Sequence, residues 1–172
     1  NLTVQLDATG AASITAAQVD NGSFDNCAIA SMALSKTDFT CSDVGANTVT
    51  LSVTDVNGKT GTCDATITIQ DNIYPTASCQ NLTVQLDASG AASITAGQVD
   101  NSSSDNCGIA SMSLDQTTFG CGDVGANTVT LTVTDTNGNQ STCTATITVQ
   151  DNVAPIANCQ NLTVVLDANG AG

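Results

Sequence analysis

The sequence predicts an all-β protein made of tandem β-sandwich repeats that form an extended rod. Hydrophobic residues alternate with hydroxyl residues, as in Thr48-Val49-Thr50-Leu51-Ser52-Val53-Thr54, and this period of two is typical of half-buried strands. No segment shows a sustained helical period. The sequence also repeats itself, since residues 1–80 match residues 81–160 at 58 of 80 positions without a gap. A fixed period of this length indicates a repeat architecture.

The 172 residues divide into two repeats and the start of a third. We predict a first repeat over residues 1–74, a second over 75–154, and the first strand of a third over 155–172. The expected linkers are residues 71–75 and 151–155, which end in Pro75 and Pro155, because Pro ends strand pairing and stiffens the chain. The sequence begins with Asn1 rather than Met, and we expect a mature or excerpted segment.

Each repeat is expected to contain six or seven short strands. In the first repeat we predict strands at residues 2–7, 12–19, 28–34, 37–41, 47–55 and 62–70, separated by turn sequences such as Asn57-Gly58. Asp43-Val44-Gly45 resembles the corner before the sixth strand of immunoglobulin-like sandwiches, although the Tyr of that corner is missing. We therefore predict immunoglobulin-like repeats whose first and last strands run parallel and start at the same end.

The charge composition excludes several functions. Sixteen Asp oppose two Lys, which gives a net charge of −14, and Glu, Arg, His and Trp are absent. Without a basic surface, the chain is not expected to bind nucleic acid or an anionic membrane. No apolar run approaches the roughly 18 residues of a membrane span, so insertion of this segment is not expected. Without His, neither a Ser–His or Cys–His couple nor His-ligated zinc can form.

The cysteines predict disulfides and an extracellular location. Four cysteines per small repeat without a CxxC pair are typical of a disulfide framework rather than a zinc site. Disulfides persist in oxidising compartments. Three Phe and one Tyr make a thin core for this length, so cross-links are expected to stabilise each repeat. The cysteines of the first repeat are Cys27, Cys41, Cys63 and Cys79, and they recur as Cys107, Cys121, Cys143 and Cys159.

Strand geometry favours particular disulfide pairs. A strand over 62–70 separates Cys63 from Cys79 by about 23 Å, whereas a disulfide needs Cα atoms within about 7 Å. Because the first and last strands of a repeat start at the same end, we expect Cys79 beside Cys143. By exclusion, the remaining predicted pairs are Cys27–Cys41 and Cys107–Cys121.

Asp and Asn side chains predict a calcium site where each linker enters a repeat. Loop 100–106, turn 135–139 and linker 71–75 are expected to meet there, and their oxygens suit Ca²⁺. A bound cation would also offset repulsion between carboxylates. The alternative is that these residues only form solvated turns. The candidate ligands are Asp71, Asn72, Asp100, Asn101, Asp105, Asp135 and Asn137, with Asp20, Asp25, Asp55 and Asp151 at equivalent positions. The predicted turn formers are Asp7, Asp43, Asp87, Asp123 and Asp167.

Four motifs point to a family. They are residues 79–87 (CQNLTVQLD), 105–110 (DNCGIA), 133–139 (VTDTNGN) and 149–155 (VQDNVAP). Together they resemble the hyalin-repeat (HYR)-like immunoglobulin-type modules of giant bacterial cell-surface adhesins, and most closely the SprB-like gliding adhesins. The resemblance implies a cell-surface filament, exported by the type IX secretion pathway and moved along the outer membrane to grip a substratum. The linkers also partly resemble the calcium linkers of cadherins.

We therefore predict a structural or adhesive stalk segment, extracellular and at the cell surface. Its expected partners are the neighbouring repeats of its own chain and an external surface or polysaccharide. An enzyme is not expected, because His, Arg and Glu are absent and no unique site breaks the repeat symmetry. The alternative is an array of carbohydrate-binding modules, which stack sugars on exposed aromatic rings. The available aromatic residues are Phe24, Phe39, Tyr74 and Phe119.

Overall fold

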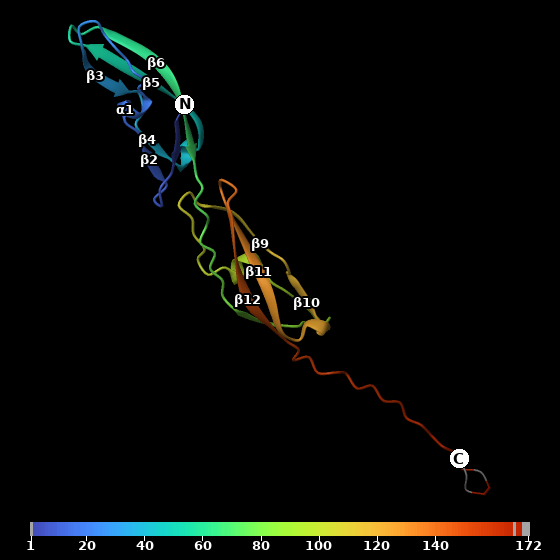
Figure 1. Cartoon of the computed structure of the whole chain (residues 1–172). Helices are drawn as coiled ribbons and strands as arrows, with labels where there is room; N and C mark the ends of the chain where they lie inside the picture. The colour runs from blue at the N-terminus through green and yellow to red at the C-terminus, as the bar shows by residue number, and fades with distance from the viewer. Residues whose placement is uncertain (1, 167, 170–172) are drawn as a thin grey trace.

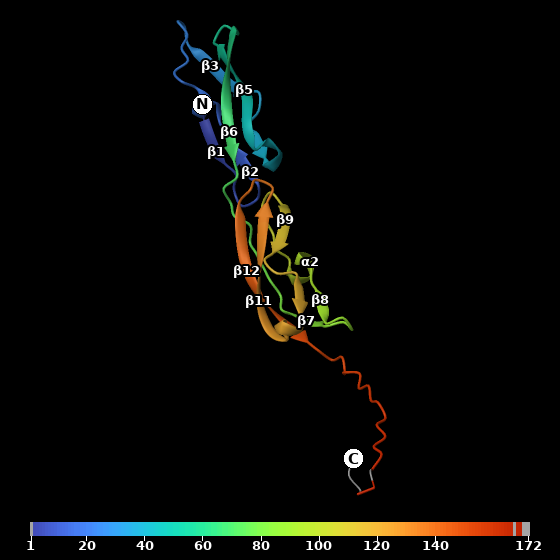
Figure 2. The ribbon, with the colours of Figure 1, turned by 90° about the vertical axis from the view of Figure 1, so that its right-hand side faces the viewer.

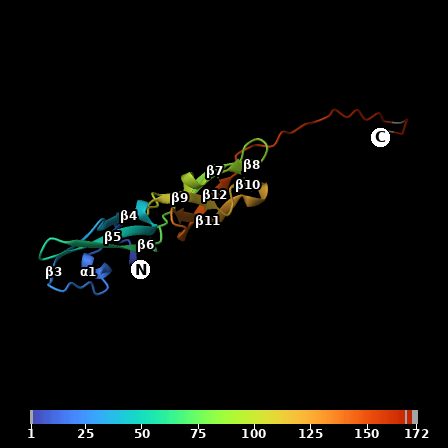
Figure 3. The same ribbon diagram turned by 90° about the horizontal axis from the view of Figure 1, so that it is seen from above.

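The computed structural model describes residues 2–166, 168 and 169. Two β-sandwiches lie end to end, and residues 151–166 extend away from the second one (Figure 1). The view turned about the vertical axis shows the same elongated arrangement (Figure 2), as does the view from above (Figure 3). The predicted all-β fold of tandem sandwich repeats is therefore confirmed.

The first repeat has a four-stranded sheet in the order β1-β6-β5-β3 and a two-stranded sheet of β2 and β4. Its strands closely follow the predicted order. The elements are β1 (Leu2–Gln5), β2 (Ala11–Ser13), α1 (Ala16–Val19), β3 (Ile29–Leu34), β4 (Asp38–Thr40), the 3₁₀ turn η1 (Cys41–Asp43), β5 (Gly45–Asp55) and β6 (Thr60–Gln70).

The second repeat has the same topology, with sheets β7-β12-β11-β9 and β8-β10. Its elements are β7 (Leu82–Gln85), β8 (Ala91–Ser93), α2 (Ala96–Val99), β9 (Ile109–Leu114), β10 (Thr118–Gly120), η2 (Cys121–Asp123), β11 (Gly125–Asp135) and β12 (Gln140–Gln150). The first and last strands of each repeat pair in parallel, with Leu2 opposite Ile67 and Leu82 opposite Ile147. This parallel arrangement confirms the prediction.

The alternating pattern places one face of each long strand in a core. In β11, Val129, Leu131 and Val133 are fully buried, while the Thr residues between them are half-buried. Each core contains one Phe, which is Phe39 in the first repeat and Phe119 in the second. The apolar side chains of the two facing sheets thus form a separate core in each repeat.

One predicted strand is partly wrong, because residues 16–19 of the predicted strand 12–19 form the short helix α1. The N–H of Thr15 donates to Oε1 of Gln18 at 2.7 Å, and the N–H of Asp20 donates to the carbonyl of Ala16 at 2.9 Å. A Thr followed three residues later by Gln is a helix-start signal. The same turn recurs as α2 in the second repeat.

The predicted first strand of a third repeat is not formed within the described residues, and the assignment of these residues to a third repeat stays a prediction. Residues 155–166 form no strand and are exposed. The first strand of a repeat forms by pairing with the last strand of the same repeat. In both β1 and β7, the paired residue lies 65 positions further along the chain. Residues 161–166 have no such strand within the 172 residues. Asp167, expected in a turn, lies outside the described residues.

Candidate metal centre at the junction of the repeats

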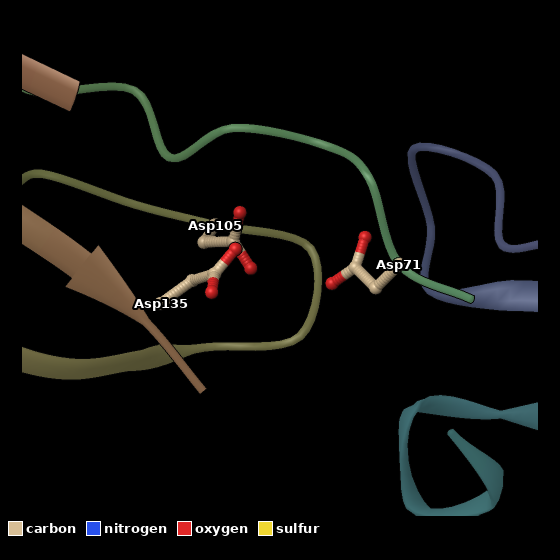
Figure 4. A group of neighbouring side chains, drawn as sticks. All are labelled: Asp71, Asp105 and Asp135. Atoms are coloured by element: carbon tan, nitrogen blue, oxygen red, sulfur yellow. The ribbon is translucent and has the colours of Figure 1, made fainter. Parts of the chain in front are cut away.

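Three aspartates from three separate segments meet where the repeats join. Asp71 follows β6, Asp105 lies between α2 and β9, and Asp135 ends β11. One carboxylate oxygen of each lies within 4.8 Å of the others. Figure 4 shows the Asp71 side chain directed from the linker toward the other two. The predicted meeting of linker, loop and turn is thus confirmed for these three residues, which we call the junction carboxylates.

Local turns orient each of the junction carboxylates. The carboxylate of Asp71 accepts from the N–H of Ile73 at 3.1 Å, and that of Asp105 accepts from the N–H of Cys107 at 2.8 Å. Asp135 Oδ1 accepts from the N–H groups of Asn137 and Asn139, both at 2.8 Å. Asp side chains commonly bond backbone N–H groups two residues on. Each turn leaves further oxygen lone pairs available.

Two asparagines that were not predicted as site residues hold the junction together. Nδ2 of Asn106 donates to the carbonyl of Asp7 at 3.2 Å and to Oδ1 of Asp71 at 3.3 Å. Nδ2 of Asn139 donates to the carbonyls of Asp71 and Ile73 and to Oδ2 of Asp135. Both residues therefore connect the second repeat to the linker. One sequence signal pointed to Asn139. The equivalent position of the first repeat is Lys59, so the two repeats differ there.

The junction carboxylates lie together without a compensating cationic side chain, and two of the three are buried while Asp105 is half-buried. Asp71 is 6% exposed and Asp135 is 1% exposed. Two unit charges about 5 Å apart repel by roughly 3 kcal/mol at an effective dielectric constant of about 20. The only two cationic side chains lie in the first repeat, where Lys36 pairs with Asp43 and Lys59 is exposed. Mutual repulsion therefore favours a bound cation.

Unpartnered oxygens provide independent support for a cation. Asp71 Oδ2, Asp105 Oδ1 and Asn106 Oδ1 are buried and accept no hydrogen bond within the described part of the chain. A buried acceptor without a donor costs free energy, more so when it is charged. All three oxygens are hard ligands, and Ca²⁺ takes about six to eight such ligands, with water completing the set. The residues of the junction therefore fit a calcium ion.

The other candidate ligands of the second repeat lie outside this group. Nδ2 of Asn72 donates to Gln5 Oε1 at 2.9 Å, and the N–H of Asn101 donates to the carbonyl of Ser78 at 2.9 Å. Asn137 contributes its N–H to Asp135. Asp100 ends α2, where a hydrogen bond from the Ser103 side chain holds the pKa of its carboxyl below the ordinary value. The structure gives these residues roles in turns and linker contacts.

The candidate ligands of the first repeat, and Asp151, occupy equivalent turns without a complete group. Asp20, Asp25 and Asp55 accept hydrogen bonds from their own loops, from the N–H groups of Ser23, Cys27 and Asn57. Asp151 accepts from the N–H of Val153 at 3.0 Å and is exposed. Within the described ranges, three acidic residues come together only at Asp71, Asp105 and Asp135. Within the described residues, Asp25 and Asp55 have no linker aspartate beside them, and Asp151 has no aspartates of a following repeat beside it.

A disulfide crosses the same junction. Cys41, in η1 of the first repeat, is bonded to Cys107 of the second, with a Cα–Cα distance of 5.3 Å. The predicted pairs Cys27–Cys41 and Cys107–Cys121 are therefore wrong. Cys27 lies near the end of β5, because Ala28 accepts from the N–H of Val56, whereas η1 precedes the start of β5. Eleven strand residues separate those ends by about 35 Å, far beyond disulfide reach.

The predicted Cys79–Cys143 disulfide is confirmed. Its Cα–Cα distance is 5.8 Å, and it ties the linker to β12. Within the described residues, the remaining cysteines have no disulfide partner, and all are exposed. They are Cys27, Cys63, Cys121 and Cys159. Each lies 80 positions from a cysteine that is paired, so each is the counterpart of a bonded residue.

The β1–β2 turn of the first repeat forms the other wall of the junction. Asp7 stabilises this turn, as predicted, by accepting from the N–H groups of Thr9 and Ala11. Gly10 has φ +74°, and a Cβ there would lie 2.6 Å from Sγ of Cys41 and 2.9 Å from the carbonyl oxygen of Asn106. Glycine is therefore required at this contact.

The aromatic residues divide between core and surface. Phe39 and Phe119 are buried, whereas Phe24 is 92% exposed and Tyr74 is 66% exposed. No repeated aromatic platform is therefore available to stack sugars. None of the helices in the described residues is long and apolar enough to cross a membrane.

Comparison with known proteins identifies no family. No family model and no curated protein matches the chain. Similar solved structures include protocadherin gamma B7 cadherin domains 1–4, at 12% identity and a TM-score of 0.38 over 87% of this chain and 48% of that one. Fibronectin(III)-like modules of Clostridium thermocellum CbhA give 9% identity and a TM-score of 0.34, over 93% of this chain and 96% of theirs. The fold assignment rests on the strand pairing described above.

Proposed function

We propose that this chain is a stalk segment of a large extracellular repeat protein, in which Ca²⁺ and disulfides hold neighbouring repeats in line. The observation that carries the proposal is the junction itself. Asp71 comes from the linker, Asp105 and Asp135 come from the second repeat, and the Cys41–Cys107 bond joins both repeats at the same place. An ion shared by these groups would restrict bending of the linker.

Repetition supports a structural role. The two repeats have the same topology and nearly the same sequence, so a longer array would differ mainly in length. We also propose that the repeat boundaries follow Tyr74 and Ala154. This choice is supported by the bonding of linker residues to the second repeat, such as Cys79 to Cys143.

Disulfides support an extracellular location, because they persist in oxidising compartments. The likeness of residues 79–87 and 133–139 to SprB-like gliding adhesins extends the proposal to a filament at the cell surface, exported by type IX secretion and used in gliding. Its external partner would then be a surface or a polysaccharide. The net charge of −14 keeps such filaments apart in solution.

Thermal unfolding of the 172-residue chain in calcium and in EGTA tests the role of the ion. At free calcium about 100 times the dissociation constant, binding adds about 2.7 kcal/mol, which corresponds to roughly 5–10 °C in Tm for a chain of this size. We expect that shift in the parent and in Asp151→Asn, which changes the exposed counterpart. We expect Asp71→Asn to lose it. Equal melting temperatures of the parent in both buffers would contradict the proposal.

A further inference from the structure

One short loop connects the junction carboxylates to the disulfide between the repeats. Asp105, Asn106 and Cys107 are consecutive, and they lie outside the helices and strands. Asp105 is one of the junction carboxylates, and Cys107 is bonded to Cys41 of the first repeat. The candidate calcium site and the disulfide therefore share the same three residues.

Hydrogen-bond donors from this loop orient two of the three junction carboxylates. The N–H of Cys107 donates to Oδ2 of Asp105 at 2.8 Å, while Oδ1 of Asp105 is buried without a donor among the described residues. Nδ2 of Asn106 donates to Oδ1 of Asp71 at 3.3 Å, while Oδ2 of Asp71 is buried and unpartnered in the same part of the chain. In each carboxylate, the loop occupies one oxygen and leaves the other for an ion.

The first repeat holds this loop in place. Sγ of Cys41 lies 3.5 Å from the carbonyl oxygen of Asn106 and 3.7 Å from that of Gly10. Nδ2 of Asn106 also donates to the carbonyl of Asp7 at 3.2 Å and lies 3.6 Å from Sγ of Cys107. Ordering a loop costs conformational entropy, and a cross-link that holds it in the binding conformation lowers that cost. The disulfide therefore preorganises two of the carboxylates.

The second disulfide has no such connection to the site. Cys79 forms a backbone bridge with Asp100 and is bonded to Cys143. Within the described residues, neither of these cysteines donates a hydrogen bond to a junction carboxylate. The cysteines of both disulfides are half-buried, so reductants reach the two bonds through similar cover. The Cys79–Cys143 bond is therefore an internal control.

We propose that the Cys41–Cys107 disulfide sets the calcium affinity of the junction, so that the site responds to redox conditions. The inference rests on the proposed calcium site and names its regulation. With the bond closed, the loop holds Asp71 and Asp105 ready for the ion. With the bond open, the ion has to order the loop itself and binds more weakly. Coupling is reciprocal, so bound calcium stabilises the disulfide against reduction by the same factor.

Reduction by a dithiol such as dithiothreitol opens the bond. One thiolate of the dithiol attacks one cysteine sulfur and releases the other cysteine as a thiolate. The second thiol of the reagent then attacks the mixed disulfide, releases the first cysteine and closes a cyclic disulfide. The protein gains two electrons and two protons, and the dithiol loses them, so the exchange balances.

Disulfide equilibria in the 172-residue chain test the coupling while the bond itself is present. The chain is freed of its unpaired cysteines by Cys27→Ser, Cys63→Ser, Cys121→Ser and Cys159→Ser. It is equilibrated with mixtures of reduced and oxidised dithiothreitol, in saturating calcium or in EGTA. Alkylation and mass spectrometry then give the reduced fraction of each bond.

Calcium should act selectively on the bond between the repeats. We expect it to lower the ratio of reduced to closed Cys41–Cys107 about tenfold, which corresponds to about 30 mV for two electrons. The ratio for Cys79–Cys143 should change by no more than about twofold. Asn106→Ala should reduce the calcium effect severalfold, because it removes the contact between the loop and Asp71. Asn26→Ala, the exposed counterpart in the first repeat, should leave that effect unchanged.

Calcium titration of the same chain distinguishes failure of this inference from failure of the proposed function. We expect Cys41→Ser/Cys107→Ser to raise the Kd for Ca²⁺ about tenfold. Calcium binding with an unchanged Kd in that variant, or equal calcium effects on both disulfides, would overturn this inference and leave the proposed calcium site standing. A chain that binds no calcium with both disulfides closed would overturn the proposed function and this inference together.

Discussion

The two repeats have nearly the same sequence but different surroundings, and the difference shows what a preceding repeat contributes. Val133 is fully buried, whereas its counterpart Val53 is half-buried. Asp135 is 1% exposed and contributes to the junction carboxylates, whereas Asp55 is only part of a local turn. Among the described residues, a linker and a neighbouring repeat cover this end only in the second repeat. Linker residues Ala77 and Cys79 pack against the core of that repeat.

The opposite ends of the repeats show the reverse difference. Cys41 is bonded across the junction, whereas Cys121 is free and exposed within the described residues. Pro75 is buried, whereas Pro155 is exposed. The stability of one repeat therefore depends on both of its neighbours, as expected for quasi-one-dimensional repeat proteins.

Removal of the inter-repeat disulfide should have the largest effect. The Cys41→Ser/Cys107→Ser double variant opens a loop with a sequence separation of 66, which should cost about 2–4 kcal/mol in the free energy of unfolding. The control is Cys27→Ser/Cys121→Ser, which changes the same repeat positions where no bond exists in this chain. Calorimetry should show a lower Tm for the first variant alone. An equal decrease in Tm in both double variants would argue against the Cys41–Cys107 disulfide between the repeats.

Substitution of the junction glycine should have the next largest effect. Gly10→Ala and Gly90→Ala both place Ala at a positive φ, of 74° and 78°, at a shared cost of about 1 kcal/mol. Gly10→Ala also pushes a Cβ against Sγ of the bonded Cys41 and the Asn106 carbonyl, which should add about 1–2 kcal/mol. At Gly90 the close atom is Sγ of the unbonded Cys121, which can rotate away. Denaturant unfolding measures the difference, and identical costs would contradict the close contact.

Truncation of a core valine should have a smaller effect that still distinguishes the repeats. Val133→Ala should cost about 2 kcal/mol, because its methyl groups are fully buried, and Val53→Ala about 1 kcal/mol. Chemical denaturation of the two single variants tests this order. A larger cost at Val53 would contradict the greater burial of Val133.

Acidification should lower the stability of both repeats by similar amounts, and this is the smallest of the expected effects. Hydrogen bonds from the Thr9 side chain and from the Ala11 N–H lower the pKa of Asp7, and bonds from the Ser89 side chain and the Ala91 N–H lower that of Asp87. A lowered pKa in the folded state gives stability above the unfolded pKa of about 4, which is lost as pH falls through the folded value.

We therefore expect the Tm difference between the parent and Asp87→Asn, measured in EDTA, to stay constant from pH 7 down to about pH 5 and to shrink below about pH 4. Asp7→Asn should show the same trend for the first repeat. A Tm difference that does not change with pH would contradict the assignment of these turns.

Sequence reasoning predicted the strands well because alternation is a local signal. Residues 16–19 were missed because the helix depends on one Thr–Gln contact rather than on a period. The meeting of Asp71, Asp105 and Asp135 followed from strand direction alone. Asn106 was missed because its amide donates to the carbonyl of Asp7, a contact that leaves no pattern in the sequence. Asn139 donates to carbonyls of the linker, and its only sequence signal was the replacement of Lys59.

The Cys41–Cys107 disulfide between the repeats could not be predicted from the repeat pattern. Cys27 and Cys107 occupy the same repeat position, so pairing Cys41 with either one joins the same two positions. The period of 80 residues hides whether a bond lies within a repeat or between repeats. The length of β5 was the physical information that separates these alternatives, since it places Cys27 and Cys41 at opposite ends of the repeat.

The number of calcium ions bound by the 172-residue chain tests the central claim most directly. The described residues contain one complete set of junction carboxylates, at Asp71, Asp105 and Asp135. Isothermal titration calorimetry of the monomeric chain, with metal removed beforehand, should therefore give one bound Ca²⁺ per chain. Asp135→Asn should abolish that binding, and Asp55→Asn, its counterpart in the first repeat, should leave it intact. No binding, or binding that survives Asp135→Asn, would contradict a calcium site at the junction.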